Sequence, residues 1–273
     1  MPLTAAVPEV KRASARGVVI AARLGYLTHG LIYGMVGALA LLTALGLSGG
    51  RITDSKGAVR RIGETAWGEP LLYAVSFGLI CYALWAAVRA LLDPEHHGRR
   101  GAALLQRLGY GVSSISHTLL GIYAFELAAG SGGGSGSKQA VIEWLNRGAG
   151  SLVLGIAGLS VIGYGLVEIY RAITGRVARE LDGSELRDRH SVRQIARVGV
   201  AARGSVFTIV GTSFVIAAVE SRASEFETFG GALRELASQP WGTLLLGVVS
   251  AGLVAYGIYM LFLARYANVP RAV

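Results

Sequence analysis

The sequence has little charge for its length. Only 16% of its 273 residues are Asp, Glu, Lys or Arg, whereas 52% are apolar and the mean hydropathy is +0.50. An ordinary soluble domain carries about 25% charged residues, so this chain has more apolar surface than a single soluble core can hide. The composition therefore predicts a membrane protein.

Charge is missing altogether from six long stretches. No Asp, Glu, Lys or Arg occurs in residues 24–50, 70–88, 108–125, 148–167, 204–219 and 236–264. A helix needs about 20 mostly apolar residues to cross the hydrocarbon layer. The stretches lack the alternation of barrel strands, which are the other structure that lipid permits. The sequence thus predicts six membrane-spanning helices.

The sequence also contains few cysteines and no recognised catalytic or ligand-binding motif. Cys81 is the single cysteine, within the second stretch, so an intrachain disulfide is excluded and a core position is expected. Residues 93–97 contain acidic and histidine side chains without a recognised ligand spacing, and we interpret them as a polar turn. No nucleophile or phosphate-binding motif occurs. We expect no catalytic residue, metal or cofactor, and a non-enzymatic role is favoured.

Basic residues are plentiful, with a net charge of +9, and they lie between the apolar stretches. Seventeen Lys and Arg fall on one side of the six spans and eight on the other. The positive-inside rule then predicts a plasma-membrane protein with both termini in the cytoplasm. The expected partners are the lipid bilayer and a further membrane protein, not nucleic acid. Residues 1–22 are expected to form a flexible tail and not a secretory signal peptide.

One pattern occurs three times along the chain. Each copy opens with Arg-x-Gly and has a Gly fourteen residues after the Arg; later a Tyr follows another Gly by fourteen residues. The Arg-to-Tyr spacings are 59, 57 and 59 residues, which chance does not explain. These repeat-equivalent positions, to which we assign structural roles, are Arg23, Arg107, Arg197, Gly37, Gly121, Gly211, Gly68, Gly150, Gly242, Tyr82, Tyr164 and Tyr256.

The three copies define the predicted organisation. They cover residues 23–92, 107–172 and 197–266, with cytoplasmic linkers at 93–106 and 173–196 and a short tail at 267–273. Because each copy holds two spans, the copies are parallel, and an all-α six-helix bundle with pseudo-threefold symmetry is predicted. A short amphipathic helix is expected on the external face between the spans of each copy. Its apolar positions are Ala58, Val59, Ile62; Ala140, Val141, Trp144; and Ala232, Leu233, Leu236.

Two further pairs of motifs carry a resemblance to a known family. They are the Trp-Gly steps at Trp67 and Trp241 and the Gly-Leu-x-x-Tyr stretches at residues 78–82 and 252–256. With the repeated Arg-x-Gly starts, they make the chain similar to the bacterial membrane family known as domain of unknown function 1206. The resemblance implies three two-helix repeats and no particular activity. The middle copy departs from it, with Ala149 in place of Trp and Ser160 in place of Gly.

Glycines on the first span predict close helix packing. Gly30, Gly34 and Gly37 share one helix face, where small residues let a neighbouring backbone approach. We expect a Gly34→Leu replacement to disrupt that contact.

Ionisable side chains inside the spans are the candidate functional groups, because each costs about 3 kcal/mol at mid-membrane on insertion scales. They are His29, His117, Glu126, Glu168 and Arg203. Glu168 and Arg203 fall at a similar depth, so we predict a buried pair that includes His29, the repeat equivalent of Arg203. The alternative is that either charge snorkels to the interface.

His117 and Glu126 are the predicted mid-membrane polar residues, too far apart on one helix to touch. His29 and His117 differ by four positions in the repeat alignment, about 6 Å in level, which argues against a bis-histidine haem. The repeated tyrosines are expected to send their hydroxyl groups to neighbouring helix ends or to the membrane interface.

Few ionisable groups in six spans leave little with which to build a selective path. The sequence therefore narrowly favours a non-enzymatic scaffold or accessory subunit of a membrane complex. The alternative is a transporter or channel for a small molecule or lipid, with a cavity along the pseudo-threefold axis lined by His117, Glu126 or Arg203. A membrane enzyme ranks third.

Overall fold

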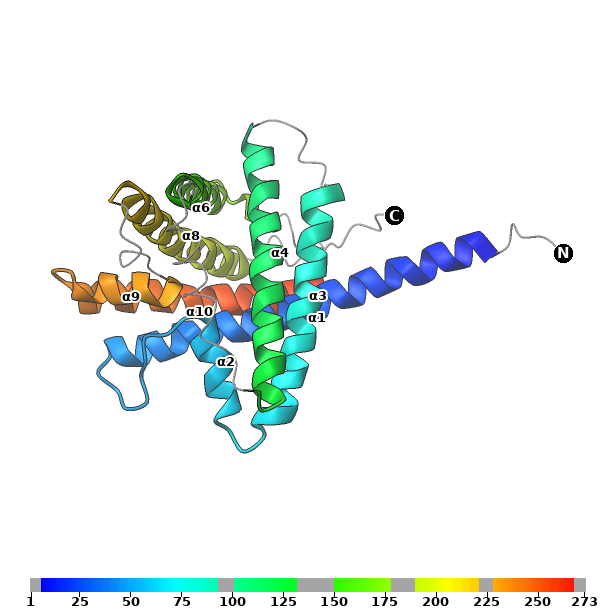
Figure 1. Ribbon diagram of the computed structural model, residues 1–273, viewed down its shortest axis with the longest axis horizontal. Coiled ribbons are helices and arrows are strands. Elements are labelled where there is room, and N and C mark those ends of the chain that lie inside the picture. Colours follow the sequence, from blue (N-terminus) through cyan, green and yellow to red (C-terminus); the bar gives the residue numbers. More distant parts are fainter. Residues whose placement is uncertain (1–5, 93–100, 132–149, 178–189, 221–227, 268–273) are drawn as a thin grey trace.

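A computed structural model describes residues 6–92, 101–131, 150–177, 190–220 and 228–267, and these residues form eight helices (Figure 1). The helices are α1 (Ala6–Ala44), α2 (Ser55–Gly63), α3 (Gly68–Leu92), α4 (Gly101–Ala128), α6 (Gly150–Ile173), α8 (His190–Val219), α9 (Phe229–Ser238) and α10 (Gly242–Tyr266). The described part of the protein is all-helical, as predicted.

Five helical segments are long and apolar enough to cross a membrane. They are Gly17–Ala44, Gly68–Leu92, Leu154–Ile173, His190–Val219 and Gly242–Tyr266. Large apolar side chains also cover the outside of the protein: Leu84, Ile156 and Val248 are all more than half exposed. An apolar exterior around long apolar helices indicates a multi-pass membrane protein. Helix α4 has 28 residues but is not among the five, because polar side chains interrupt it.

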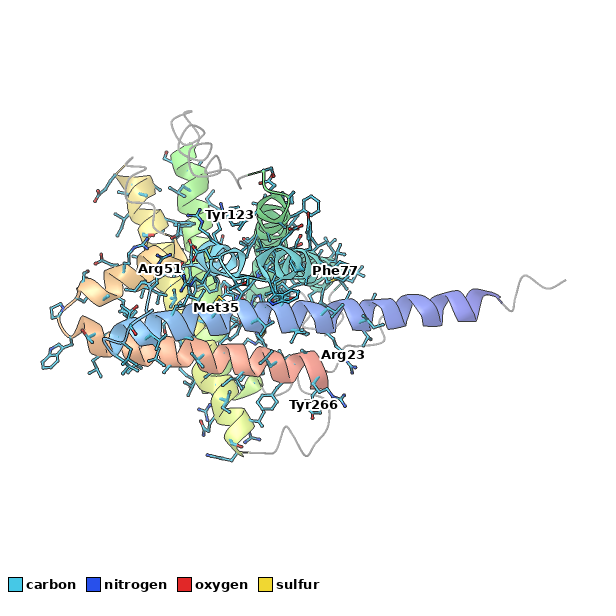
Figure 2. The ribbon with its side chains drawn as sticks, turned by 90° about the horizontal axis from the view of Figure 1, so that it is seen from below. Arg23, Met35, Arg51, Phe77, Tyr123 and Tyr266 are labelled. Carbon is cyan, nitrogen blue, oxygen red and sulfur yellow. The ribbon has the colours of Figure 1, made fainter. Side chains whose placement is uncertain are left out.

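The long helices associate in three pairs, each joining two different copies of the repeat. Helix α3 packs along α4, α6 along α8, and α10 along α1. The pairs run in different directions and do not share one bundle axis: α3 and α4 cross the direction of α1 and α10 in Figure 1, and Figure 2 shows α3 nearly end-on beside Phe77. Each last helix of one copy is thus held by the first helix of another.

Small residues lie at equivalent positions in the interface of each helix pair. The glycine fourteen residues after each opening Arg faces a Ser or Gly that lies six residues before a repeated Tyr. A methyl group at Gly211 would lie 2.7 Å from the Gly158 carbonyl oxygen, so only glycine fits there. The facing positions are Gly37 and Ser250, Gly121 and Ser76, and Gly211 and Gly158.

The repeated glycines of α1 give a direct test of this packing. A methyl group at Gly37 would lie 2.7 Å from the Val254 nitrogen and 2.9 Å from the Ser250 carbonyl oxygen, whereas one at Gly34 would meet only the Gly257 Cα, at 4.0 Å. We expect Gly37→Ala to destabilise the protein by about 1–3 kcal/mol through overpacking. Gly34→Ala, the matched control, should melt like the wild type in detergent. Equal melting temperatures for the two variants would contradict this account.

Two of the repeated arginines cap the preceding helix. Arg107 donates from Nε to the carbonyl oxygen of Ala90 (2.8 Å) and from Nη2 to that of Leu91 (2.9 Å), at the end of α3. Arg197 makes the equivalent two bonds at the end of α6, at 2.8 and 3.0 Å. The last carbonyl groups of a helix lack partners within it, and a cation there also complements the helix dipole. The repeated Arg is therefore a structural residue at these two copies, while Arg23 is exposed.

Helices α2 and α9 follow the predicted amphipathic pattern. Helix α2 buries Ala58, Val59 and Ile62, and its first turn is capped by Asp54. Helix α9 buries Ala232 and Leu233, is capped by Thr228, and leaves Leu236 half-buried. The corresponding positions of the middle copy, Ala140, Val141 and Trp144, lie outside the described residues, as do the polar stretch 93–97 and half of the linker 173–196.

The N-terminal segment corrects one prediction. Residues 1–22 were expected to form a flexible tail, but α1 begins at Ala6 and continues without a break to Ala44 (Figure 1). Pro8 falls in the first turn, where its missing N–H costs nothing. The residues that follow are mostly Ala, Val, Lys and Arg, and Gly17 is the residue among them with the lowest helix propensity.

Candidate functional site

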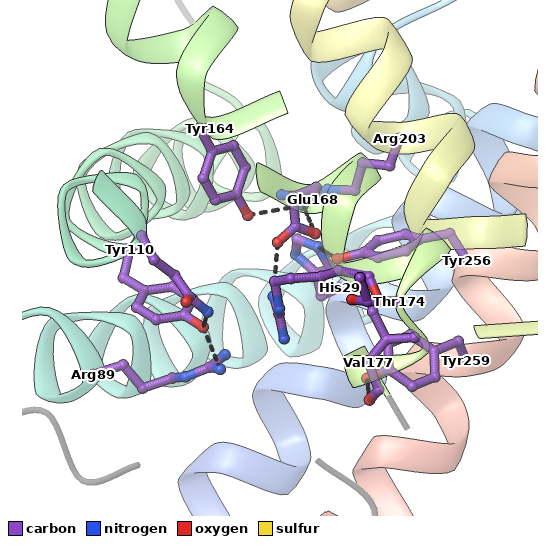
Figure 3. Close-up of polar contacts among 12 residues, drawn as sticks. His29, Arg89, Tyr110, Tyr164, Glu168, Thr174, Val177, Arg203, Tyr256 and Tyr259 are labelled. Atoms are coloured by element: carbon purple, nitrogen blue, oxygen red, sulfur yellow. Dashed lines mark hydrogen bonds and ion pairs between the residues drawn. The ribbon is translucent and has the colours of Figure 1, made fainter. Parts of the chain in front are cut away.

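Polar and aromatic side chains from all three copies meet in the interior. This central polar cluster consists of His29 and Tyr33 from α1, Tyr82 from α3, His117 from α4, Tyr164 and Glu168 from α6, Arg203 from α8 and Tyr256 from α10. Figure 3 shows several of these side chains converging from separate helices. His29 is fully buried and Arg203 is 2% exposed, so the cluster belongs to the interior and not to the surface.

Two histidines form the middle of a hydrogen-bonded chain. The Nδ1 atom of His29 lies 2.8 Å from Nε2 of His117, and Nε2 of His29 lies 3.1 Å from the Tyr256 hydroxyl. Nδ1 of His117 lies 2.6 Å from the Ser113 carbonyl oxygen, which can only accept. With both rings neutral, one direction is therefore imposed: Tyr256 donates to His29, His29 donates to His117, and His117 donates to Ser113.

This contact corrects the predicted separation of His29 and His117. An offset of four positions in the repeat alignment was expected to put them at different levels, yet the rings face each other with centroids 4.7 Å apart. The alignment offset equals a difference in depth only if helices run parallel, and α4 crosses the direction of α1. At a nitrogen separation of 2.8 Å the rings bond directly, which leaves no room for an iron with bonds of about 2 Å to each nitrogen.

Glu168 and Arg203 lie together, and a second arginine joins them. Nη1 of Arg203 is 3.5 Å from Oε2 of Glu168, and Nη1 of Arg171 is 2.8 Å from Oε1. Arg203 also donates to the Tyr164 hydroxyl at 2.9 Å. The carboxylate thus bridges two guanidinium groups, which is the arrangement that buried charges require in an apolar surrounding. Snorkelling, the alternative drawn from the sequence, does not describe Arg203.

Aromatic rings link Arg203 to the histidines. The guanidinium carbon lies 5.0 Å from the ring centre of Tyr256 and 5.5 Å from that of Tyr33, and both rings pack against His29. Such cation–π contacts stabilise a desolvated arginine by about 2 kcal/mol. His29 and Arg203 therefore share the cluster through Tyr33 and Tyr256.

The repeated tyrosines also correct a prediction. Their hydroxyl groups were expected at helix ends or at the interface, but Tyr82 and Tyr256 are buried, Tyr164 is half-buried, and all three line one internal cavity of about 30 Å³. Glycine makes this possible, because the glycine of each Arg-x-Gly start packs against the tyrosine of the same copy. These contacts are Gly25 with Tyr82, Gly109 with Tyr164, and Gly199 with Tyr256. The space that glycine leaves lets the backbone of Tyr82 and Tyr256, and the ring of Tyr164, approach the neighbouring helix.

The cavity lies toward the ends of α3, α6 and α10. Besides the tyrosines, Arg89 and Arg171 line it, and both come from the last turn of their helices. Arg89 donates to the Tyr110 hydroxyl at 2.5 Å, as Figure 3 shows. We call this end, where the sequence predicts the cytoplasm, the inner end.

The opposite side of the cluster is closed by rings. Phe229, the first residue of α9, packs edge-on against Tyr33 and Phe207, with ring centres 5.6 and 5.8 Å away. The next residue, Gly230, packs against the backbone of Thr53 and Asp54, just before α2. The start of α9 and the segment just before α2 thus meet at the outer end of the cluster.

Glu126 does not join the cluster. It was predicted as a mid-membrane residue, but α4 ends at Ala128, so Glu126 lies in the last turn and is half-buried. Its carbonyl oxygen accepts a hydrogen bond from Ser131. The apolar stretch that suggested a deep position continues up to Phe125, and its charge-free length hid the end of the helix.

Sequence reasoning missed four residues of the site: Tyr33, Arg89, Arg171 and Phe207. The two arginines were assigned to the cytoplasmic segments because each follows an apolar run. A signal was present, however, because Arg89 and Arg171 each stand seven residues after a repeated Tyr, at equivalent positions of two copies. Two equivalent arginines near a predicted helix end were a reason to look for a shared site.

The fold and the cluster together define a class: a helical, multi-pass membrane protein built from three tandem two-helix repeats around a polar interior. The family described as Domain of Unknown Function (DUF1206) matches this chain three times, over residues 24–93, 108–175 and 198–267. The chain belongs to this family. The three matches coincide with the three copies found from the Arg, Gly and Tyr spacings.

A relative covers almost the same length. The chain is 30% identical over 249 residues to a protein of Bacillus subtilis (strain 168) named "Uncharacterized protein YxxB", and the match covers 90% of each chain. No solved structure matches the chain.

Proposed function

We propose that this protein transports a small polar solute across the plasma membrane, with the central polar cluster as its binding site. The observation that carries this proposal is the cluster itself, in which charged and titratable groups from three repeats share one buried place. Ionisable groups inside membrane proteins are expensive and typically belong to solute or proton pathways. A cavity at the inner end and aromatic rings that close the outer end are what an alternating-access transporter has when its binding site is open to one side only.

Six spans are part of this proposal, with α4 as the sixth. Its residues Gln106 and His117 are buried and Ser114 donates to the Ala83 carbonyl oxygen, while large apolar side chains cover most of its exposed face. The exposed stripe, at helical spacing, is Leu104, Leu108, Val112, Ile115, Leu119, Ile122 and Phe125. A helix of 28 residues is about 42 Å long and crosses about 30 Å of hydrocarbon at a tilt of about 45°. Strongly tilted pairs, related by a pseudo-threefold axis, are therefore compatible with a bilayer.

Both termini then lie on the cytoplasmic side. The test is labelling by a membrane-impermeant maleimide in a Cys81→Ala background, with single cysteines introduced at Ala6 and Ala272. Both positions should react in inverted vesicles and stay protected in intact cells. Labelling of the two ends from opposite sides would exclude an even number of spans.

The sequence alone favoured a scaffold, because five scattered ionisable groups seemed too few for a path. The geometry supports transport better, since four of those groups gather in one cluster and Arg89 and Arg171 line its cavity. A scaffold needs no such cluster in its interior, where each charge costs free energy of folding. An accessory role with a membrane-protein partner remains the competing outcome of the test.

The test is transport by the purified protein in liposomes. Solid-supported-membrane electrophysiology should give currents for at least one of phosphate, acetate and glutamate, and a pH-sensitive dye in the lumen should report any accompanying proton flux. Empty liposomes serve as the control. Absence of current and of proton flux, together with a stoichiometric partner in co-purification from native membranes, would replace transport with the scaffold role.

A further inference from the structure

We infer that the inner cavity binds an oxyanion, the carboxylate or phosphate group of a small solute. The inference rests on the proposed function, because it names the substrate class of the same site. Fourteen residues line the cavity, and three of them carry a guanidinium group while one carries a carboxylate. These charged residues are Arg89, Arg171, Arg203 and Glu168.

Arg203 supplies a second, independent observation. Its side chain is 2% exposed, and its Nε atom is buried without a hydrogen-bond partner among the described residues, although its Nη1 atom contacts Tyr164 and Glu168. A buried N–H of a charged group left without a partner is costly. An acceptor oxygen in the adjacent cavity would satisfy it. Because arginine presents its donors as a planar fork, carboxylates and phosphates are the natural acceptors.

The chemistry of the remaining lining agrees with an anion. Six tyrosines and three arginines line the cavity with hydroxyl and guanidinium groups, whereas Glu168 already accepts from Arg171 and Arg203. Binding of a cation in the cavity is disfavoured, because its lining contains three guanidinium groups and one carboxylate that already accepts from two of them. The cavity volume of about 30 Å³ has room on the order of two water molecules. It fits the charged end of a ligand, so the ligand is small.

The repeat explains how the site arises. Arg89 and Arg171 occupy the same position in the first and second copies, and Leu263 occupies it in the third. The third copy contributes Arg203 instead, at the position where the first copy has His29. The threefold pattern of the chain is thus broken at the cavity, which gives one charged side and one apolar side.

The experiment measures anion binding directly in detergent, without transport. Melting temperature and isothermal titration are recorded with sodium phosphate, acetate or chloride at matched ionic strength. The variants are Arg89→Gln and Arg171→Gln, with Arg89→Lys and Arg171→Lys as versions that retain the charge but not the fork. Arg265→Gln is the matched control, because Arg265 lies at the same end of α10 but is exposed and outside the cavity.

We expect phosphate or acetate, and not chloride, to raise the melting temperature of the wild type and of Arg265→Gln. The Gln variants should lose affinity by about tenfold or more, and the Lys variants by less. In nanodiscs, stabilisation by phosphatidylglycerol that needs Arg89 and Arg171, without an effect of free anions, would assign the oxyanion to a lipid headgroup. No anion-specific shift up to about 10 mM together with no effect of phosphatidylglycerol, or a shift that the Gln variants retain, would overturn the inference.

The two proposals fail separately. Anion binding without any flux would leave the oxyanion site in place and remove the transport function. Flux without anion binding would support the transport function and rule out an oxyanion as the ligand of the cavity.

Discussion

Glu168→Gln should reduce the folded yield more than any other single change at the cluster. Glu168 is the one carboxylate between Arg171 (2.8 Å) and Arg203 (3.5 Å), and its side chain is 5% exposed. Removing its charge leaves two buried guanidinium groups facing a neutral amide. Breaking a buried ion pair by removing one partner typically costs about 3–5 kcal/mol. Size-exclusion profiles and melting temperatures in mild detergent measure the loss.

An exposed pair on α2 is the matched control. Arg61 donates to Glu64 at 2.7 Å with the same spacing of three residues along a helix, but both side chains are about half exposed. The hydrogen bond from Arg61 lowers the pKa of the Glu64 carboxyl, yet solvent screens such a pair. Glu64→Gln should leave yield and melting unchanged.

A double variant separates charge balance from packing. If the loss in Glu168→Gln comes from uncompensated positive charge, adding Arg203→Gln should restore part of the folded yield, because fewer buried charges remain. Additive losses in the double variant would show that the two side chains act independently, against the pairing that their geometry indicates.

The sequence was sufficient for the repeats and for much of the packing. Glycines recur because helix backbones in lipid approach closely only at small residues, and the predicted face of Gly30 and Gly37 does pack against α10. The apolar positions of α2 were correct for the same kind of reason, since helical spacing decides which side chains share a face. Local rules, which act within about four residues, were the reliable ones.

Relations between distant segments could not be predicted in this way. The sequence treats all spans as parallel, but the helix pairs cross, so residues offset by four positions in the alignment meet face to face, as His29 and His117 do. Arg89 and Arg171 looked like interfacial charges, because their burial depends on which helix ends converge on them. The predicted pairing of Glu168 with Arg203 was correct, whereas the predicted depth of Glu126 and the contact of His29 with His117 were not.

Replacing His117 with Gln should block proton movement while leaving the protein folded. The chain from Tyr256 through His29 to His117 has one direction when both rings are neutral. A neutral histidine can take a proton on one ring nitrogen and release one from the other. A Gln side chain offers an oxygen that accepts from His29 but has no nitrogen that titrates. The contact therefore survives and the relay does not.

Two further variants separate the relay from stability. His117→Leu removes the acceptor as well, leaving the His29 N–H buried and unsatisfied, at a cost of about 1–3 kcal/mol; it should lower the melting temperature, whereas His117→Gln should not. His190→Gln is the surface control, because His190 is exposed at the start of α8. In liposomes matched for folded protein, proton flux should fall by about tenfold or more in His117→Gln and stay unchanged in His190→Gln. Undiminished flux in His117→Gln would mean that the histidine pair only holds α1 against α4, since a hydrogen bond that Gln can accept is all that such a role requires.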